Sequence, residues 1–442
     1  MNPAAAEQPA FSPQYKRGVF HSLWISQMVS MLGSGLTAFA LRVWAFEQTE
    51  SVTQFALITF FYGLPGILLS PIAGVWADRW NRRWVMILSD LGAGIATFFI
   101  WLLFVLNQLE VWHIYTAVIL ISLFNTIQQP AYAATIPMLV PKENLGRANG
   151  ITQIGPALAR IISPMLGGFL LVAIGLNGVA EIDLATFLFA MLVLFLIRIP
   201  RPTAADADNA EKETMRQQIA AGWRYVRERA GLLNILLLFM VIDFTQGMIV
   251  VLIAPLVLGF ADASVLGTVF AVSGMGALLG AVAMGVWGGP KRRVHGVLGF
   301  SLLRSLLLFM GGLQPNAWLV AGASALYLFF SQIATGSMRT IWQIKVPQEL
   351  QGRVFSVRLL VGALFFPLGQ LLSGVLADKV FQPLLDADGL LAGNVGLMIG
   401  TGPGRGIGLM LIVLGIFNLV VTLFGYANPR IRRIEDEIPD AI

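Results

Sequence analysis

Long apolar runs separated by short polar connections dominate the chain from about residue 20 to residue 427. Each run is about 20 residues or longer, which is the length that an α-helix needs to cross the hydrocarbon core of a bilayer. Gly and Pro interrupt many runs, as membrane helices tolerate. The predicted spans are 20–46, 52–76, 84–107, 112–138, 148–175, 180–198, 232–259, 265–288, 294–313, 317–343, 354–380 and 406–427. The pattern predicts an all-α integral membrane protein of about twelve transmembrane helices.

The composition agrees with a membrane environment. Of the 442 residues, 57% are hydrophobic and only 12% are charged, whereas soluble domains carry about 25% charged residues. The chain has no cysteine, which excludes disulfides and thiolate metal sites. Its three histidines, His21, His113 and His295, are far apart in the sequence. We therefore expect neither a metal nor another cofactor.

Basic residues concentrate in alternate connections. The connections after even-numbered spans hold most of them, including Arg82, Arg83 and the run 291–293, whereas the opposite connections are mostly acidic. This asymmetry predicts that both termini lie on the cytoplasmic side of the membrane. The expected location is a bacterial cytoplasmic (inner) membrane. Orientation in the bilayer also explains the pI of about 9.6, so we expect no nucleic-acid partner.

One long polar stretch, at about 199–231, divides the chain. Its second part is a basic amphipathic pattern in which Ile219, Trp223 and Val226 share a face, as is typical of a helix at an anionic lipid surface. The predicted units are a cytoplasmic tail at 1–17, a six-helix bundle at 18–200, a cytoplasmic linker with an amphipathic helix at 201–231, a second six-helix bundle at 232–428 and a cytoplasmic tail at 429–442.

The two predicted bundles share sequence patterns. Residues 141–147, after span four, match residues 347–353, after span ten, in Pro, Glu, Gly and Arg without a gap. The Gly-Val-Trp…Arg-Arg pattern of residues 74–83 returns at 285–293, one residue shorter. Two matches at equivalent places predict a duplicated six-helix unit, an architecture of transporters that bind substrate between their halves.

The connection between spans two and three carries the sharpest motif, Gly74-Val-Trp-Ala-Asp78-Arg79-Trp-Asn-Arg82-Arg83. It resembles the G-x-x-x-D-R-x-x-R-R loop motif of the major facilitator superfamily. This resemblance implies two six-helix repeats and a cytoplasmic gate. Asp78 can pair with Arg82 or Arg83, or lie against a positive helix N-terminus, and release as the halves rock. The alternative is that the basic residues only anchor the loop on the cytoplasmic side.

One further residue and one further motif are interpreted through the same resemblance. An acidic residue at the position of Asp90 supports the loop network in the family, and we favour that role over proton carriage. Pro164, Gly167 and Gly168 in span five resemble the family's antiporter motif, with Ser163 in place of the usual Gly. The motif implies a bent, closely packed helix that seals an exporter against leak. The alternative is an ordinary packing face of small residues.

Several segments resemble the branch of the superfamily that contains macrolide-efflux proteins and enterobactin exporters. The segments that carry this resemblance are 32–36, 129–131, 136–141, 147–150 and 183–187. It implies export of a small amphiphilic compound, such as a drug, a macrolide-like antibiotic or a siderophore. Span four lacks the central Arg of some drug exporters and has Phe124-Asn125-Thr126 instead, so their proton-coupling scheme does not transfer directly.

Ionisable residues at membrane depth are costly and are therefore functional candidates. We predict that Asp243 in span seven gains and loses a proton during transport, with Arg160 in span five as its partner. A static structural pair is the alternative. By the resemblance, span seven lines the cavity and span nine, with Arg304, does not. The polar candidates for the substrate cavity are Gln27, Asn125, Gln128, Gln246 and Gln332.

The predicted function is secondary active export by proton-coupled antiport and alternating access. The expected partners are a small-molecule substrate, protons and the lipid bilayer, and we expect a monomer. A proton-coupled importer on the same fold is the alternative, and only the span-five motif and the branch resemblance argue against it. We expect no enzymatic activity, because the sequence offers no clustered nucleophile and base and no metal-ligand set.

Overall fold

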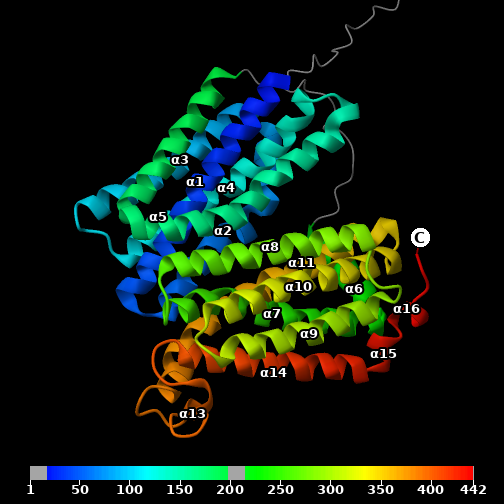
Figure 1. Ribbon diagram of the computed structural model, residues 1–442. Coiled ribbons are helices and arrows are strands. Elements are labelled where there is room, and N and C mark those ends of the chain that lie inside the picture. Colours follow the sequence, from blue (N-terminus) through cyan, green and yellow to red (C-terminus); the bar gives the residue numbers. More distant parts are fainter. Residues whose placement is uncertain (1–16, 198–214, 442) are drawn as a thin grey trace, which may run out of the picture.

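The computed structural model describes residues 17–197 and 215–441, and within these ranges the side chains of residues 17, 70–79, 142 and 215–218 are outside the description. All regular secondary structure in the described ranges is helical (Figure 1). Eleven of these helices are long and apolar enough to cross a membrane. The predicted all-α integral membrane fold is therefore confirmed.

The first half consists of α1 (Arg17–Thr49), α2 (Val52–Arg79), α3 (Arg82–Val105), α4 (Val111–Leu139), η1 (Lys142–Asn144) and α5 (Leu145–Leu196). The second half contains the long helices α7 (Ala230–Leu258), α8 (Ala263–Trp287), α9 (Arg293–Leu313), α10 (Ala317–Lys345), α11 (Gln348–Leu376) and α14 (Arg405–Ala427). Its shorter elements are α6 (Met215–Glu228), η2 (Ala377–Phe381), α12 (Gln382–Leu384), α13 (Val395–Ile399), α15 (Pro429–Arg432) and α16 (Ile434–Glu437).

The length of α5 explains why the structure has eleven long helices where the sequence predicts twelve spans. Its 52 residues would extend about 78 Å at 1.5 Å per residue, more than twice the thickness of a hydrocarbon core. Gly175 interrupts it with φ 69° and ψ 179°, a conformation that glycine adopts readily. The break lies between the predicted spans 148–175 and 180–198, so two spans follow one another in α5 and the fold fits twelve crossings.

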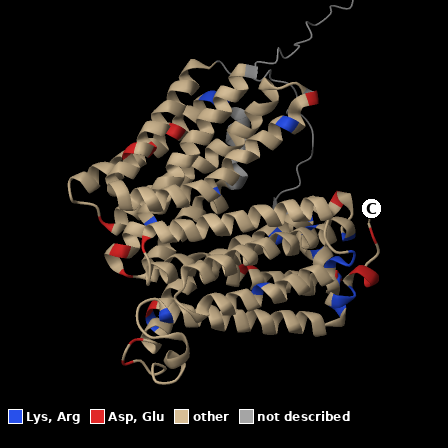
Figure 2. Cartoon of the chain, viewed as in Figure 1, with Lys and Arg blue, Asp and Glu red and all other residues tan. Residues whose placement is uncertain are grey.

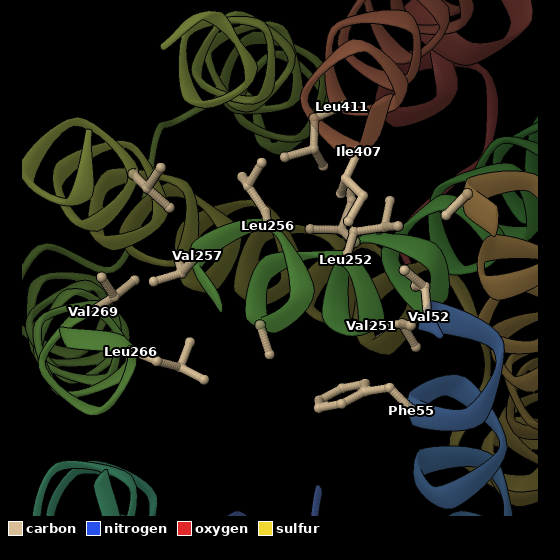
Figure 3. Close-up of a cluster of buried hydrophobic side chains, with 14 of the residues drawn as sticks. Val52, Phe55, Val251, Leu252, Leu256, Val257, Leu266, Val269, Ile407 and Leu411 are labelled. Carbon is tan, nitrogen blue, oxygen red and sulfur yellow. The ribbon is translucent and has the colours of Figure 1, made fainter. Parts of the chain in front are cut away.

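The two halves meet at one end and diverge at the other (Figure 1). We call the end that carries the α1–α2 and α7–α8 connections the distal end, and the opposite end, where α1 begins and α14 finishes, the terminal end. The apolar cluster at the distal end joins residues of both halves, with Val52 and Phe55 of α2 facing Val251 of α7 (Figure 3). At the terminal end, each apolar cluster of the described residues belongs to one half only.

Side-chain caps fix the beginnings of several helices. Asp262 accepts hydrogen bonds from the backbone N–H groups of Ser264 and Val265, both at 3.0 Å, and so caps α8. The bonds from Val265 N–H and from the Ser264 hydroxyl hold the pKa of the Asp262 carboxyl below its usual value. Asn81 caps α3 and Asn316 caps α10 in the same way. These polar caps mark helix ends that the apolar pattern alone places only approximately.

The C-terminal segment packs on the terminal end of the second half. Both carboxylate oxygens of Glu435 accept bonds from the first backbone N–H groups of α9, those of Arg293 and Val294, at 3.0 Å each. Lys345, the last residue of α10, is buried and its Nζ donates to the Asp440 carboxylate at 2.8 Å and to the Glu435 carbonyl at 2.6 Å. Lys and Arg positions, blue in Figure 2, gather along the chain at this end of the second half.

Candidate functional site

The closest contact between the halves is a seam of small residues where α5 crosses α8. A Cβ atom at Gly168 would lie 2.2 Å from the carbonyl oxygen of Ala263, and one at Gly267 would lie 2.4 Å from the carbonyl oxygen of Pro164. Gly167 faces α1 instead, where a Cβ would lie 3.1 Å from Phe39. The structure thus places Pro164 and Gly168 in the seam between the halves, where small residues allow backbones to approach closely.

A carboxylate from the second half holds the beginning of α2 at the distal end. Asp378, in the π-helical turn η2, accepts hydrogen bonds from the Ser51 hydroxyl at 2.7 Å, Val52 N–H at 2.9 Å and Thr53 N–H at 2.8 Å. The N-terminus of a helix is an electropositive site with unpaired N–H donors, so a carboxylate binds there favourably. Asp378 was not a sequence candidate, because nothing in its local sequence indicates a partner 325 residues away.

Substitution of Asp378 by alanine is expected to open the distal end. Three bonds to an ionised acceptor contribute about 2 kcal/mol to the distal contact, so the ratio of closed to open molecules should fall about thirtyfold. Because the chain lacks cysteine, spin labels on Gln108→Cys and Leu390→Cys can report this distance. Asp388→Ala, an exposed carboxylate nearby, is the control. An unchanged distance distribution in Asp378→Ala would contradict the assignment.

The arginines of the loop motif bind helix ends within the first half. Arg82 donates from Nη1 to the carbonyl oxygen of Ala134 in α4 at 2.7 Å. Arg83 donates to the carbonyl oxygens of Leu194 at 3.0 Å and Phe195 at 2.6 Å. Cations are favourable near helix C-termini, so the pair ties α3 to the terminal ends of α4 and α5. Gly74, Asp78 and Arg79 have side-chain positions outside the described residues.

Asp90, which the sequence assigned to the loop network, forms one polar cluster with two of the cavity candidates. Asp90 of α3 accepts hydrogen bonds from the side-chain amides of Gln27 in α1 at 3.1 Å and Gln128 in α4 at 2.7 Å. The Gln128 amide also donates to Gln27 Oε1 at 3.0 Å. Asp90 is 6% exposed and Gln128 9%. We call this set the Asp90 cluster.

Asp243 of α7 lies among arginines of the second half. Arg358 of α11 and Arg304 of α9 both act electrostatically on it. The carboxylate also lies close to α11, because a Cβ at Gly362 would be 3.4 Å from Asp243 Oδ2. Arg160, the partner expected from the sequence, is exposed on α5 and is not among the charges that act on Asp243.

Arg304 is the centre of a second polar cluster, which the sequence did not predict. Its Nη2 donates to Gln246 Oε1 at 2.7 Å and to the Tyr327 hydroxyl at 2.5 Å, and the guanidinium lies 4.4 Å from the Tyr327 ring centroid. The Tyr327 hydroxyl donates to Gln246 Oε1 at 2.6 Å. Gln246 is the only cavity candidate in this Arg304 cluster. The signal that could have found it is an arginine in the middle of an apolar span.

The remaining cavity candidates stay apart from both clusters. Asn125 of α4 and Gln332 of α10 are half-buried, and neither side chain forms a hydrogen bond within the described part of the chain. Asp183, in the second span of α5, is 2% exposed and accepts a bond from the Ser34 hydroxyl of α1 at 3.2 Å. The structure therefore brings together Gln27, Asp90 and Gln128, but not Asp243 and Arg160.

Comparisons with known proteins agree with this architecture. The sequence pattern of the Major Facilitator Superfamily matches residues 23–369. The chain is 24% identical to macrolide efflux protein A of Streptococcus pyogenes over 369 residues, which are 82% of this chain and 90% of that protein. It is 26% identical to the enterobactin exporter EntS of Citrobacter koseri over 338 residues, 76% of this chain and 79% of that protein.

Solved structures share the fold. A bacterial homologue of the human lysosomal transporter Spinster, in an inward-facing and unoccupied conformation, is 17% identical, with a TM-score of 0.65 over 94% of this chain and 97% of that chain. The nucleoside transporter NupG, as a D323A mutant, is 12% identical, with a TM-score of 0.69 over 92% and 99% of the two chains. At these identities the likeness shows the arrangement of helices and no shared substrate.

Proposed function

The chain belongs to the Major Facilitator Superfamily of membrane transporters, and from that premise we propose that it exports a small amphiphilic compound by proton-coupled antiport. The cargo class is a drug, a macrolide-like antibiotic or a siderophore. The similarity to macrolide efflux protein A and to the enterobactin exporter supports this direction and class. The protein works as a monomer in a bacterial inner membrane in this proposal.

The asymmetric contact between the halves carries the mechanistic part of the proposal. Apolar side chains of both halves pack together at the distal end, whereas the terminal-end clusters each remain within one half. The excess of basic residues in the terminal-end connections supports a cytoplasmic terminal end. In that orientation the structure corresponds to a state open to the cytoplasm, and rocking of the halves about the α5–α8 seam would expose a central site to the other side.

The proposed coupling group in the second half is Asp243. Desolvation disfavours the charged form of this carboxyl, whereas Arg358 and Arg304 favour it, and movement of α11 relative to α7 would change that balance. Conformational change and proton binding at Asp243 are then linked. Gly74, Asp78, Arg79, Arg82 and Arg83 form the proposed cytoplasmic gate. Pro164 and Gly168 form the proposed seal of the seam, and Gly167 packs the same helix against α1. Gln27, Asn125, Gln128, Gln246 and Gln332 are proposed to contribute polar groups near the cargo.

Export assays test this function directly. A bacterial strain without its own drug and siderophore exporters would express the chain and be loaded with a macrolide antibiotic or with enterobactin. The proposal predicts lower accumulation of at least one compound than in cells with empty vector, and loss of the difference when a protonophore is added. Higher accumulation in expressing cells would show import, and a protonophore-resistant difference would exclude coupling to protons.

A further inference from the structure

We propose that Asp90, held by Gln27 and Gln128, is a second proton-binding site, located in the first half and separate from Asp243. The proposal rests on the proposed proton-coupled function and adds a site to it. The sequence favours a role for Asp90 in the loop network, but both of its carboxylate oxygens are engaged by side-chain amides of α1 and α4. The loop arginines Arg82 and Arg83 bind helix carbonyls.

Asp90 has no charged partner within the described ranges. Only desolvation and the two amide hydrogen bonds act on its carboxyl. The described titratable or cationic side chains on the helices around it are His21, Arg42 and Glu47 of α1, Tyr62 of α2, Arg82 and Arg83 of α3, His113, Tyr115 and Tyr132 of α4, and Arg147, Arg160, Glu181 and Asp183 of α5. None of them acts on Asp90. An ionised Asp90 is therefore a single uncompensated charge at membrane depth, which is costly, and proton uptake removes that charge.

The hydrogen bonds of Asp90 couple its protonation state to the positions of side chains on α1 and α4. In the structure Asp90 only accepts bonds, from the amides of Gln27 and Gln128, as an ionised carboxylate does. A protonated carboxyl becomes a donor and needs an acceptor. The amide groups that face the two Asp90 oxygens are N–H donors, which cannot accept, so the glutamine beside the protonated oxygen must turn its amide to accept the new bond. Proton binding at Asp90 thus changes the contact between α1 and α4.

The position of Asp90 suits proton exchange at the terminal end. It lies eight residues after the start of α3 at that end, which corresponds to about 12 Å along a helix. In the state that the structure represents, the halves diverge on this side. We infer that Asp90 releases its proton to terminal-side water in this state and takes one from distal-side water in the opposite state. One proton is bound and one is released in each cycle.

Two other acids in the predicted spans, Asp243 and Asp183, have different surroundings from Asp90. Asp243 has two arginines acting on it, which favour its charged form. Asp183 packs against Gly33, where a Cβ would lie 3.1 Å from its Oδ1 and 2.1 Å from the Thr186 hydroxyl, so its side chain has little space to rearrange. Asp183 shares with Asp90 the neutral donors on two helices, which are α1 and α3, and the absence of a nearby cation among the described residues, so its close packing is what distinguishes it from Asp90.

Infrared difference spectroscopy during a pH titration tests the site without any cargo. Purified full-length protein in lipid should show a carboxylic-acid C=O band that disappears as the pH rises. The band should be missing in Asp90→Asn, remain in Asp183→Asn, and shift in frequency in Gln128→Leu, which retains the carboxyl but loses a donor. A pH-difference spectrum that is the same in wild type and Asp90→Asn would overturn the proposal.

Transport measurements separate a coupling role from a structural one. In proteoliposomes, Asp90→Asn should lose at least about tenfold in uptake driven by a proton gradient, while exchange of labelled for unlabelled cargo without a gradient continues. Asp90→Glu should restore gradient-driven transport in part. Loss of exchange in Asp90→Asn and in Asp90→Glu would assign a structural role and overturn the proposal. If the wild type fails to transport macrolide or enterobactin, the proposed function fails, and the infrared result still decides the site.

Discussion

Replacement of Asp243 by asparagine is expected to reduce proton-driven export by at least about tenfold, because it leaves the buried Arg304 and the half-buried Arg358 without their carboxylate. Arg358 then meets the repulsion of Arg339 without a compensating negative charge, and the proposed coupling proton has no acceptor. The measurement is cargo efflux from inverted vesicles with an imposed proton gradient. Asp262→Asn, a carboxylate outside the membrane span, is the matched control and should transport normally.

A charge-neutral pair would show whether the effect of Asp243→Asn comes from charge imbalance. The double variant Asp243→Asn with Arg358→Gln should fold as well as the wild type, and its thermal stability in detergent should exceed that of Asp243→Asn alone. Gradient-driven export should remain lost in the double variant, because the proton acceptor is still missing. Undiminished proton-dependent efflux in Asp243→Asn would remove Asp243 from the mechanism and leave a static role.

Replacement of Gly168 by leucine is the second substitution with a large expected effect. A side chain at this position meets the backbone carbonyl of Ala263, and a backbone atom cannot move aside as a flexible side chain can. The halves must separate at the seam, so the distal-closed state should become a minor population and export should fall at least about tenfold. The distance between spin labels at Gln108→Cys and Leu390→Cys should lengthen.

Gly322→Leu is the control for the added side-chain volume. Gly322 lies in α10, is exposed, and has no heavy atom within 4 Å of the position that its Cβ would take. We expect normal export and an unchanged distance in this variant. Gly168→Leu protein that is well folded, exports at the wild-type rate and keeps the short distance would show that the seam is not needed for closure.

The sequence predicted which segments lie in the membrane, because that depends on whether each side chain is more stable in lipid or in water. Apolar length and the positions of polar breaks placed the spans, because a helix in lipid must be long enough and satisfy its own backbone groups. The merged helix α5 escaped prediction because Gly175 turns the chain without the polar connection that a loop usually needs. The docking of Glu435 and Lys345 also escaped it, since a polar segment near a terminus does not specify its partner.

The sequence indicated which residues belong to the candidate site, but it did not indicate which of them contact one another. Asp90, Asp243 and Arg304 stand out in apolar spans, because a charge at membrane depth is costly. Their partners come from helices far away in the sequence, so Gln128 could not be assigned to Asp90, nor Arg358 to Asp243. The pairing of Asp243 with Arg160 failed to appear because Arg160 lies exposed on α5 while α11 supplies a nearer cation. Helix packing, which no single sequence specifies, decides these contacts.

Reversible locking of the distal end is the most direct test of transport by rocking halves. The Ser51 hydroxyl and an Asp378 carboxylate oxygen lie 2.7 Å apart on opposite halves, so Ser51→Cys with Asp378→Cys can form a disulfide in a chain that has no other cysteine. We predict that the oxidised variant binds cargo but exports none, and that a reducing agent restores export in the same sample to the level of the Ser51→Ala, Asp378→Ala double variant. Equal export by the oxidised and reduced forms would contradict alternating access through this interface.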